Sequence, residues 1–518
     1  MTAGAWTSRP PRRLTAVGVI GSLLLGGCVV GPNFHPARPD TPAAWLAARS
    51  APAPASAVTV GEPADPAWWK SFDDPELSSL IARALAANLD ARQAVLRIEE
   101  AREQRRMAAA AAWPSIDANG SYAKTRISER TATTSLLGAL GGLGVSGESG
   151  PPGGVAAALP GLENPFDQYQ AGLSGAWEID LFGRVRRQVE AADATTEAAA
   201  WDRRAVQVSL MSDVAAVYID LRDAQGRLRV LSDTVATAGA VLRLAAEARR
   251  SDLGGDVDVA AATSALASAK AALPPVEAEL TIDENQLALL LAAKPGALDS
   301  ELADPRAVPP LPPSVPAGVP AELARRRPDI REAEARLHAA VARQGVAVAD
   351  LYPRVVINAA AGTEAISPAA LGDWAARYFA VGPTLDLPVF DAGLRRANVR
   401  IADIRSREAA TAYAQAVLGA LHDVEDAIAA YGQEQARRRN LAAAAEQNRT
   451  ALTLVERRYR GGVASFRDVL EAQAQVQSAQ LALVASAGAA ATDLVSLYKA
   501  LGGGWESADA SPAPRPDR

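Results

Sequence analysis

A pair of carboxylates, Asp468 and Glu471, is the feature of this sequence best suited to chemistry. They lie three residues apart in RYRGGVASFRDVLEAQ, so a helix would place both on one face. Two like charges this close repel each other and attract cations, which makes the pair a candidate for cation selection or for a charge-controlled switch. The alternative is a solvated acidic face beside a turn, which is a common feature of helices.

The rest of the sequence excludes the common catalytic and metal-binding patterns. No glycine-rich phosphate loop and no nucleophile with a base partner is present, so we expect no enzyme. The histidines, His35, His338 and His422, are too scattered to hold a metal, and one cysteine cannot form a disulfide framework. With 53 basic and 59 acidic residues, the chain has no strong charge that would favour nucleic acid. We therefore expect no cofactor, no metal and no nucleic-acid partner.

The N-terminus predicts export and lipid attachment. Three arginines precede an apolar run, residues 14–25, which leads into LGGC at Cys28. This order is that of a signal peptide, residues 1–27, and the run is too short to span a membrane. LGGC resembles a bacterial lipobox, in which Cys28 would become the lipid-modified first residue; the alternative is a free cysteine. Val29 in place of an aspartate implies the outer membrane, and no later stretch looks long and apolar enough for a spanning helix.

One strand pattern stands out, QYQAGLSGAWEIDLF at residues 168–182. Its odd positions are apolar and its even positions are polar or small, which is typical of a strand with two different faces. The polar face ends in two carboxylates, Glu178 and Asp180. If the strand crosses a membrane, its lipid-facing side carries Tyr169, Leu173, Trp177, Ile179 and Leu181.

The sequence is organised as two repeats. In each, a helix ends at an aromatic residue followed by proline, two strands form a hairpin, and two long helices follow. The expected divisions are a lipidated extended leader (28–67), repeat one (68–300), a Pro-rich linker (301–321), repeat two (322–505) and a disordered tail (506–518). The expected strands are 115–126 and 168–182, joined by a Gly-rich loop (127–167), and 354–364 and 378–390; the expected helix tips lie near 253–259 and 460–470.

The long helices carry a coiled-coil pattern. Apolar residues recur at alternating steps of four and three from Leu210 to Ala245, and the second repeat shows the same steps from Val417 to Tyr431. A helix of about 70 residues is roughly 100 Å long. A fibrous scaffold is the ordinary interpretation of such heptads, but a scaffold does not need amphipathic strand hairpins and a lipid anchor.

Closure of the strands requires more than one chain. Even the smallest filled barrels use about eight strands, and open sheet edges are not viable in lipid. A chain with two strand hairpins would therefore share its barrel with copies of itself. Two or three chains both satisfy this requirement.

The whole mature sequence resembles the TolC-like outer-membrane efflux proteins, specifically their OprM/NodT lipoprotein branch. The motifs that carry the resemblance are CVVGPNFHP (28–36), WWKSFDDPELSSLI (68–81), AWEIDLFGRVRR (176–187), RRRPDIREAEARL (325–337), PTLDLPVFDAGLRR (383–396), RYRGGVASFRDVLEAQ (458–473) and YKALGGGW (498–505). The resemblance implies a mainly α protein that is a trimer with a shared twelve-stranded membrane β-barrel. An α-helical tunnel would extend into the periplasm and dock a membrane-fusion adaptor and an inner-membrane pump of the RND type.

The same resemblance implies a gate at the helix tips. Asp468 and Glu471 match the family's acidic constriction, and Tyr459 matches an aromatic residue that holds the tip closed in some members. Asp258 matches an acidic position of the first tip only if its turn absorbs a deletion, because that turn looks about two residues short. Ala464 stands where some members carry a basic residue.

The function implied is an outer-membrane exit duct that exports drugs or other toxic small molecules. The alternatives are the exit channel of a type I protein secretion system and a lipid-anchored coiled-coil scaffold without a pore.

Overall fold

The computed structural model describes residues 29–36, 41–46, 57–60, 65–126, 165–251 and 255–509. The chain divides into two compact units. The first is built from residues up to 34, 104–192 and 340–404, and the second from residues 35–103, 193–339 and 405 onward. Cys28 and most of the Gly-rich loop lie outside the described residues, as does the centre of the first helix tip.

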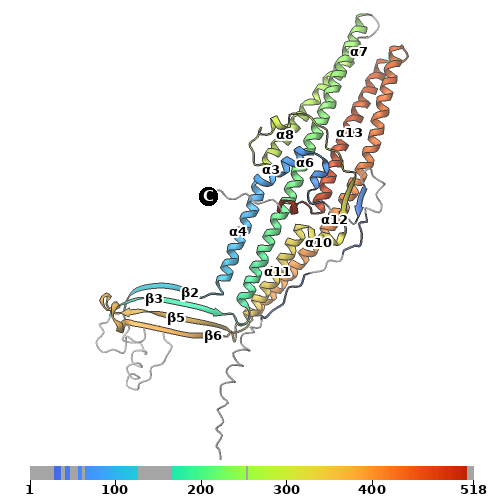
Figure 1. Ribbon diagram of the computed structural model, residues 1–518. Coiled ribbons are helices and arrows are strands. Elements are labelled where there is room, and N and C mark those ends of the chain that lie inside the picture. The colour runs from blue at the N-terminus through green and yellow to red at the C-terminus, as the bar shows by residue number, and fades with distance from the viewer. Residues whose placement is uncertain are drawn as a thin grey trace, which may run out of the picture. The chain divides into compact units, whose positions relative to one another are not determined.

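The first unit contains a four-stranded antiparallel sheet (Figure 1). Its strands are β2 (Ser115–Thr125), β3 (Phe166–Ile179), β5 (Arg354–Ala365) and β6 (Arg377–Asp386), in the order β2-β3-β5-β6. The short 3-10 helices η3 (Pro368–Gly372) and η4 (Trp374–Ala376) connect β5 to β6. β2 and β6 are therefore the edge strands.

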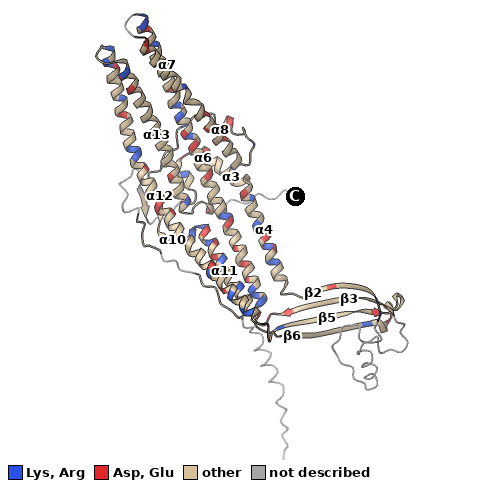
Figure 2. Cartoon of the chain, turned by 180° about the vertical axis from the view of Figure 1, so that it is seen from behind, with Lys and Arg blue, Asp and Glu red and all other residues tan. Residues whose placement is uncertain are grey.

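The strand register gives this sheet one apolar and one polar face. Leu173 on β3 lies opposite Ala118 on β2 and Ala361 on β5, and Ala361 lies opposite Phe379 on β6. Large apolar side chains on this face are exposed in the chain: Ile116, Tyr122, Leu173, Trp177, Phe379, Val381 and Leu385. Most of each strand also lacks charged residues (Figure 2). An apolar face of this extent marks a surface that meets lipid or another protein.

The opposite face is lined by polar and small side chains. Gln168 Nε2 donates to Glu364 over 2.6 Å, Gln170 Nε2 donates to the Tyr378 hydroxyl over 2.8 Å, and Asn358 Nδ2 donates to Thr384 over 2.8 Å. These bonds join β3 to β5, β3 to β6 and β5 to β6 on one side of the sheet. The alternation of apolar and polar residues in the sequence therefore corresponds to the two faces of the sheet, as predicted.

Two strand ends differ from the sequence expectation. β3 ends at Ile179, so Leu181 is not part of the strand as expected. The reason is that Asp180 accepts a hydrogen bond from the Arg186 backbone N–H, and Gly183 turns the chain with a φ of +83° to begin the next helix. β6 ends at Asp386 instead of near residue 390, because Pro388 has no N–H to continue a ladder.

The second unit is mainly helical. Its helices are α3 (Pro75–Ala87), α4 (Leu89–Ala110), α6 (Arg184–Arg250), α7 (Asp256–Ala271), α8 (Leu273–Leu290), α9 (Asp299–Leu302), α10 (Pro320–Arg326), α11 (Pro328–Ala349), α12 (Leu394–Arg460), α13 (Phe466–Ala500) and α14 (Trp505–Asp509), with the 3-10 helix η1 (Trp68–Phe72) before them. Helices α4, α6, α11 and α12 also contribute residues to the first unit. In Figure 1, α7 returns beside α6 and α13 returns beside α12.

The expected coiled-coil seam is confirmed. All its residues on α6 are buried or half-buried, and Val214, Leu221 and Ala224 are completely buried. On α12 the seam residues Val417, Val424 and Tyr431 are buried as well. The alternating steps of three and four thus bury one face of each long helix.

Four sequence expectations about this unit need correction. The Pro-rich segment 301–321 is not a bare linker, because β4 (Ser314–Gly318) within it pairs in parallel with β1 (Ala57–Val60), a strand of the supposedly extended leader. The expected tail begins inside α14. One described helix after Cys28, α13, is long and apolar enough to cross a membrane, with a window of mean hydropathy 1.5. Packed core helices pass the same test, and Leu494 and Leu497 of α13 are completely buried.

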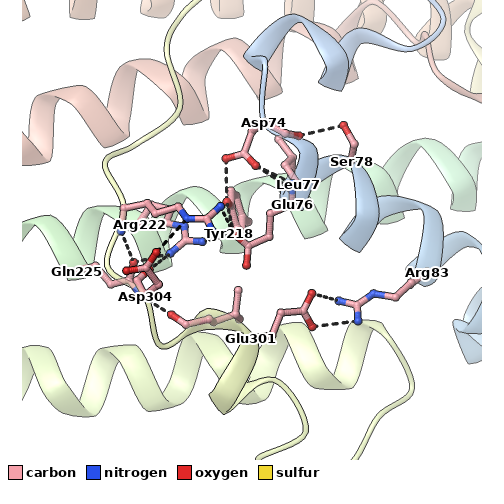
Figure 3. A network of polar contacts seen from close by, with 12 residues as sticks. Asp74, Glu76, Leu77, Ser78, Arg83, Tyr218, Arg222, Gln225, Glu301 and Asp304 are labelled. Carbon is pink, nitrogen blue, oxygen red and sulfur yellow. Dashed lines mark hydrogen bonds and ion pairs between the residues drawn. The ribbon is translucent and has the colours of Figure 1, made fainter.

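A buried polar network fixes the first repeat (Figure 3). Arg222 on α6 donates to Glu76 over 2.6 Å, to Gln225 over 2.7 Å and to the Asp304 carbonyl over 3.0 Å. The Arg222 side chain is 0% exposed and that of Glu76 is 10% exposed. Tyr218 donates to Asp74 over 2.8 Å, and Asp74 also caps the N-terminus of α3. This network ties α3, α6 and the chain after α9 together.

The second repeat has a more exposed counterpart. Arg327 binds Asp329 at 2.7 Å and Asp423 at 2.9 Å, and it donates to the Ala500 carbonyl over 3.0 Å. Its two acidic partners are 44% and 55% exposed. Arg327 therefore joins α11, α12 and the end of α13 next to solvent.

Candidate gate at the helix tips

The second tip is a short turn between α12 and α13. Gly462 has a φ of +75°, a left-handed conformation that favours glycine, and it ends α12. The backbone N–H groups of Gly461, Gly462 and Val463 close the last helical turn on the carbonyls of Arg457, Tyr459 and Arg458. Five residues separate Arg460, the end of α12, from Phe466, the start of α13.

Asp468, the third residue of α13, caps the N-terminus of this helix. Its Oδ2 accepts from the Ser465 backbone N–H over 2.8 Å, and the Ser465 hydroxyl accepts from the Asp468 N–H over 3.2 Å. This reciprocal arrangement is a capping box, which satisfies two N–H groups that the helix leaves unpaired. The bond from the Ser465 N–H lowers the pKa of Asp468, with smaller contributions from Arg458 and Arg467. Asp468 is therefore held as a fixed anion.

Glu471 follows Asp468 by three residues on α13. It is exposed and has no ion-pair partner among the described residues. Both carboxylates thus face solvent in the single chain, about one helical turn apart. Only one of them is fixed by a local hydrogen bond.

Tyr459, the aromatic residue expected at the gate, is half-buried. Its ring centre lies 5.9 Å from that of Phe466. Phe466 itself is 6% exposed and packs with Val241 and Ala245 of α6 and Ala262 of α7. We call these four buried residues, Val241, Ala245, Ala262 and Phe466, the tip cluster. Sequence reasoning missed Phe466, although a large aromatic residue at the start of an alanine-rich helix was a visible signal.

The first tip is as long as the second, so the expected shortage of two residues is wrong. Helices α6 and α12 each have 67 residues, and five residues follow each before the next helix begins. The error came from aligning the two Gly-Gly pairs, which occupy different ends of their turns. Gly255 directly precedes α7, whereas Gly461 directly follows α12.

With equal turns, Asp258 and Asp468 occupy the same position of their helices. Each is the third residue of the return helix, and Asp258 Oδ2 accepts from the Gly255 N–H over 3.3 Å. The first tip has Ala261 where the second has Glu471. An exposed ion pair lies beside it, in which Arg249 Nε lies 2.6 Å from Asp256.

A cavity of about 440 Å³ separates the two helical hairpins below the tip cluster. It is lined from α6, α7, α12 and α13, and half of its lining residues are polar: Asp233, Thr234, Thr237, Ser268, Gln473, Gln477 and Gln480. Hydroxyl and amide groups at this density favour water over close apolar packing. Within the described part of the chain, no group of His, Cys, Asp and Glu could hold a metal ion.

The strand residues expected to face lipid are brought together by the sheet. The Tyr169 and Tyr122 rings are in tilted contact with ring centres 5.0 Å apart, and Leu173 lies on the same exposed face. Trp177 donates to the Ala112 carbonyl over 3.0 Å. Ile179 is the last strand residue and lies opposite Val355. On the other face, Glu178 binds Arg184 at 2.6 Å, so the polar end of the strand is tied to the start of α6.

Comparisons with known proteins agree with this architecture. The family described as outer membrane efflux protein matches residues 80–293 and 319–503. The chain is 31% identical to the probable efflux pump outer membrane protein TtgC of Pseudomonas putida, over 94% of each chain. It is 28% identical to nodulation protein T of Rhizobium leguminosarum bv. trifolii, over 80% of this chain and 81% of the relative. The solved outer-membrane channel OprN superposes with a TM-score of 0.80 at 34% identity, covering 92% of this chain and 100% of that one.

Proposed function

This chain belongs to the outer membrane efflux protein family, and we propose that it is the trimeric exit duct of a three-part pump for small molecules. Its place in the outer membrane and its role as an efflux channel follow from the family and from its likeness to OprN. The number of copies, the gate, the lipid anchor and the partners form the proposal.

The observation that carries the proposal is the two-faced sheet with free edges. The apolar face suits lipid and the polar face suits a water-filled lumen. Four strands cannot close a barrel, and unpaired edges are not viable in the hydrocarbon layer. Three copies would pair β6 of one chain with β2 of the next and give a shared barrel of twelve strands. Tyr169, Leu173, Trp177 and Ile179 would then meet lipid.

The tunnel would narrow at the helix tips. In a three-fold assembly, Asp468 and Glu471 would form two stacked rings of carboxylates, and Tyr459 would help to hold the tip closed. Rings of acidic side chains attract cations and set the selectivity of many pores. Asp258 would add a third, weaker ring from the first tip of each chain.

The lipid anchor and the two repeats are also part of the proposal. A signal peptide (1–27) would be removed and Cys28 would be acylated, which places the leader at the membrane surface. Repeat one and repeat two would each supply one strand hairpin and one helical hairpin.

The cargo and the partners follow from the relatives. Proteins similar to this chain are named for the efflux of toluene and of antibiotics. Small toxic molecules are therefore the proposed cargo. A periplasmic membrane-fusion adaptor and an inner-membrane pump of the RND type would complete the system, because a passive duct has no energy source of its own.

Planar bilayer recording of the purified protein tests the duct. We expect discrete conductance steps that multivalent cations block from one side of the membrane, since the acidic rings lie at one end of the tunnel. Preparations that insert into the bilayer but never conduct would contradict a channel. Conductance without any block by cations would remove the acidic gate while leaving the duct in place.

A further inference from the structure

We propose that Phe466 is the positioning residue of the gate: it seats the second tip against the first helical hairpin and so controls how often the tip opens. This inference rests on the proposed duct and adds a packing element to its charged gate. Phe466 is the first residue of α13 and precedes Asp468 by two residues. Any movement of Phe466 therefore moves the carboxylates with it.

Burial distinguishes Phe466 from two other large apolar residues described at the tips, Val463 and Val257. Val463 is 68% exposed and Val257 is 80% exposed, whereas Phe466 is only 6% exposed. It is buried with the other three members of the tip cluster, and the partly buried Leu242, Val259, Tyr459 and Leu470 pack against this cluster. Because Val241, Ala245 and Ala262 belong to the first hairpin, the ring crosses from one hairpin to the other.

The contact that Phe466 makes lies at the tip end of the two hairpins. The polar-lined cavity lies on one side of it, and the next buried apolar cluster, Ala224, Leu231 and Val276, lies beyond that cavity. Small side chains make up the rest of the tip cluster, and alanine buries little apolar surface. Phe466 is the one buried member of the tip cluster that comes from the second hairpin, and Tyr459 and Leu470 of that hairpin pack against the cluster as partly buried neighbours.

Among the described residues of the first tip, no aromatic contact matches that of Phe466. Arg249 and Asp256 occupy the positions of Tyr459 and Phe466, because each long helix has 67 residues and each turn has the same length. Arg249 and Asp256 are 46% and 84% exposed and bind each other. The aromatic pair of the second tip is thus replaced by an ion pair in solvent, so each chain has one aromatic contact between its hairpins at this level.

Single-channel recording of Phe466→Ala, Phe466→Leu and Asp256→Ala tests the role of the ring. We expect Phe466→Ala to raise the open probability about tenfold, which corresponds to about 1.4 kcal/mol. Phe466→Leu should give an intermediate value, because leucine keeps part of the apolar volume. Asp256→Ala changes the equivalent residue of the first tip and should leave the open probability unchanged. Cation block should persist in all three variants because Asp468 and Glu471 remain.

The outcomes separate this inference from the duct itself. A conducting wild-type protein whose Phe466→Ala variant opens no more often would overturn the role of Phe466 and leave the duct intact. A wild-type protein that does not conduct would contradict the duct. If Phe466→Ala does not assemble, Phe466→Leu decides: increased opening supports the inference, and wild-type opening overturns it. Hydrogen exchange gives a second readout, with faster exchange expected in residues 241–262 as well as 460–470 of Phe466→Leu.

Discussion

The two helix tips of this chain share a backbone plan and differ in what their side chains do. Both follow 67-residue helices, both have turns of the same length, and both place an aspartate at the third position of the return helix. Among the described residues, the second tip differs by an aromatic pair, Tyr459 and Phe466, and by Glu471, a carboxylate three residues after the shared aspartate where the first tip has Ala261. The two repeats thus share the geometry of the turn but differ in their side chains. The aromatic packing and the pair of carboxylates one helical turn apart are found at the second tip.

The two polar networks that hold the repeats differ in the same way. Arg222 is fully buried with Glu76 in the first repeat, whereas Arg327 contacts two largely exposed aspartates in the second. A buried charge that loses its partner is much more destabilising than an exposed one. We therefore expect a substitution in the polar network to destabilise the first repeat more than the second. The second repeat, in contrast, carries the aromatic contact and the acidic pair at its tip.

The largest effect should come from Arg222→Ala. Removal of Arg222 leaves the Glu76 carboxylate without its main buried partner, and such losses cost about 3–5 kcal/mol of folding free energy. Arg327→Ala tests the network of the second repeat and should cost about 1–2 kcal/mol, because water can solvate its two acidic partners, which are 44% and 55% exposed. Chemical denaturation in detergent measures both, and equal costs would remove the difference between the two networks.

The next effect concerns the acidic pair of the second tip. Replacement of Asp468 and Glu471 together by alanine should raise single-channel conductance or weaken block by multivalent cations several-fold, because the negative charge at the constriction is lost. Asp258→Ala is the control from the first tip and should change block much less, since no second carboxylate follows it there. Unchanged conductance and unchanged block in the double variant would contradict the gate.

A smaller effect should separate the two roles of Asp468. Asp468→Asn keeps an oxygen that can accept from the Ser465 N–H but removes the charge, whereas Asp468→Ala removes both. We expect Asp468→Asn to weaken cation block while amide exchange in the first turn of α13 stays slow. Asp468→Ala should also speed that exchange. If both variants exchange equally fast, the capping role of Asp468 is wrong.

A pH effect should be the smallest and should arise in the first hairpin. Burial raises the pKa of Asp283 on α8 from 3.8 to about 6, with the nearby charges of Asp220 and Glu279 acting in the same direction and Arg227 opposing them. The folded state then binds a proton that the unfolded state releases. Stability from this group is complete below pH about 4 and is lost as pH rises to about 6.

Asp283→Asn tests this effect because it removes the titrating group while preserving its shape. The thermal midpoint of the wild-type protein should fall between pH 4 and 6 more steeply than that of Asp283→Asn. Parallel curves for the two proteins would show that Asp283 does not titrate in this range.

The features that could be predicted from the sequence are those that show a pattern within a few residues. The coiled-coil seam and the two-faced strands repeat every few residues, so they are visible in short windows. The acidic pair of the second tip was visible for the same reason, since Asp468 and Glu471 lie within one helical turn. The cap by Asp468 was within reach too, because a serine three residues before an aspartate is a known start signal.

The features that could not be predicted from the sequence depend on contacts between segments that lie far apart in it. Phe466 is buried by residues of α6 and α7 that lie more than 200 positions earlier, and Arg222 meets Glu76 across 146 positions. Nothing in a short window shows which faces will meet. The wrong length expected for the first turn has a different cause. The two Gly-Gly pairs were aligned with each other, although they lie at opposite ends of their turns, and this became visible only from the ends of the helices in the structure.

The native mass of the protein, extracted in mild detergent from isolated outer membranes, tests the central claim most directly. The account predicts three copies of the mature chain, because each copy supplies only four strands and leaves β2 and β6 unpaired. A trimer would support shared closure of the barrel and the alternation of two unlike tips around the tunnel. A monomer or a dimer in several detergents would contradict the shared barrel, and with it the duct.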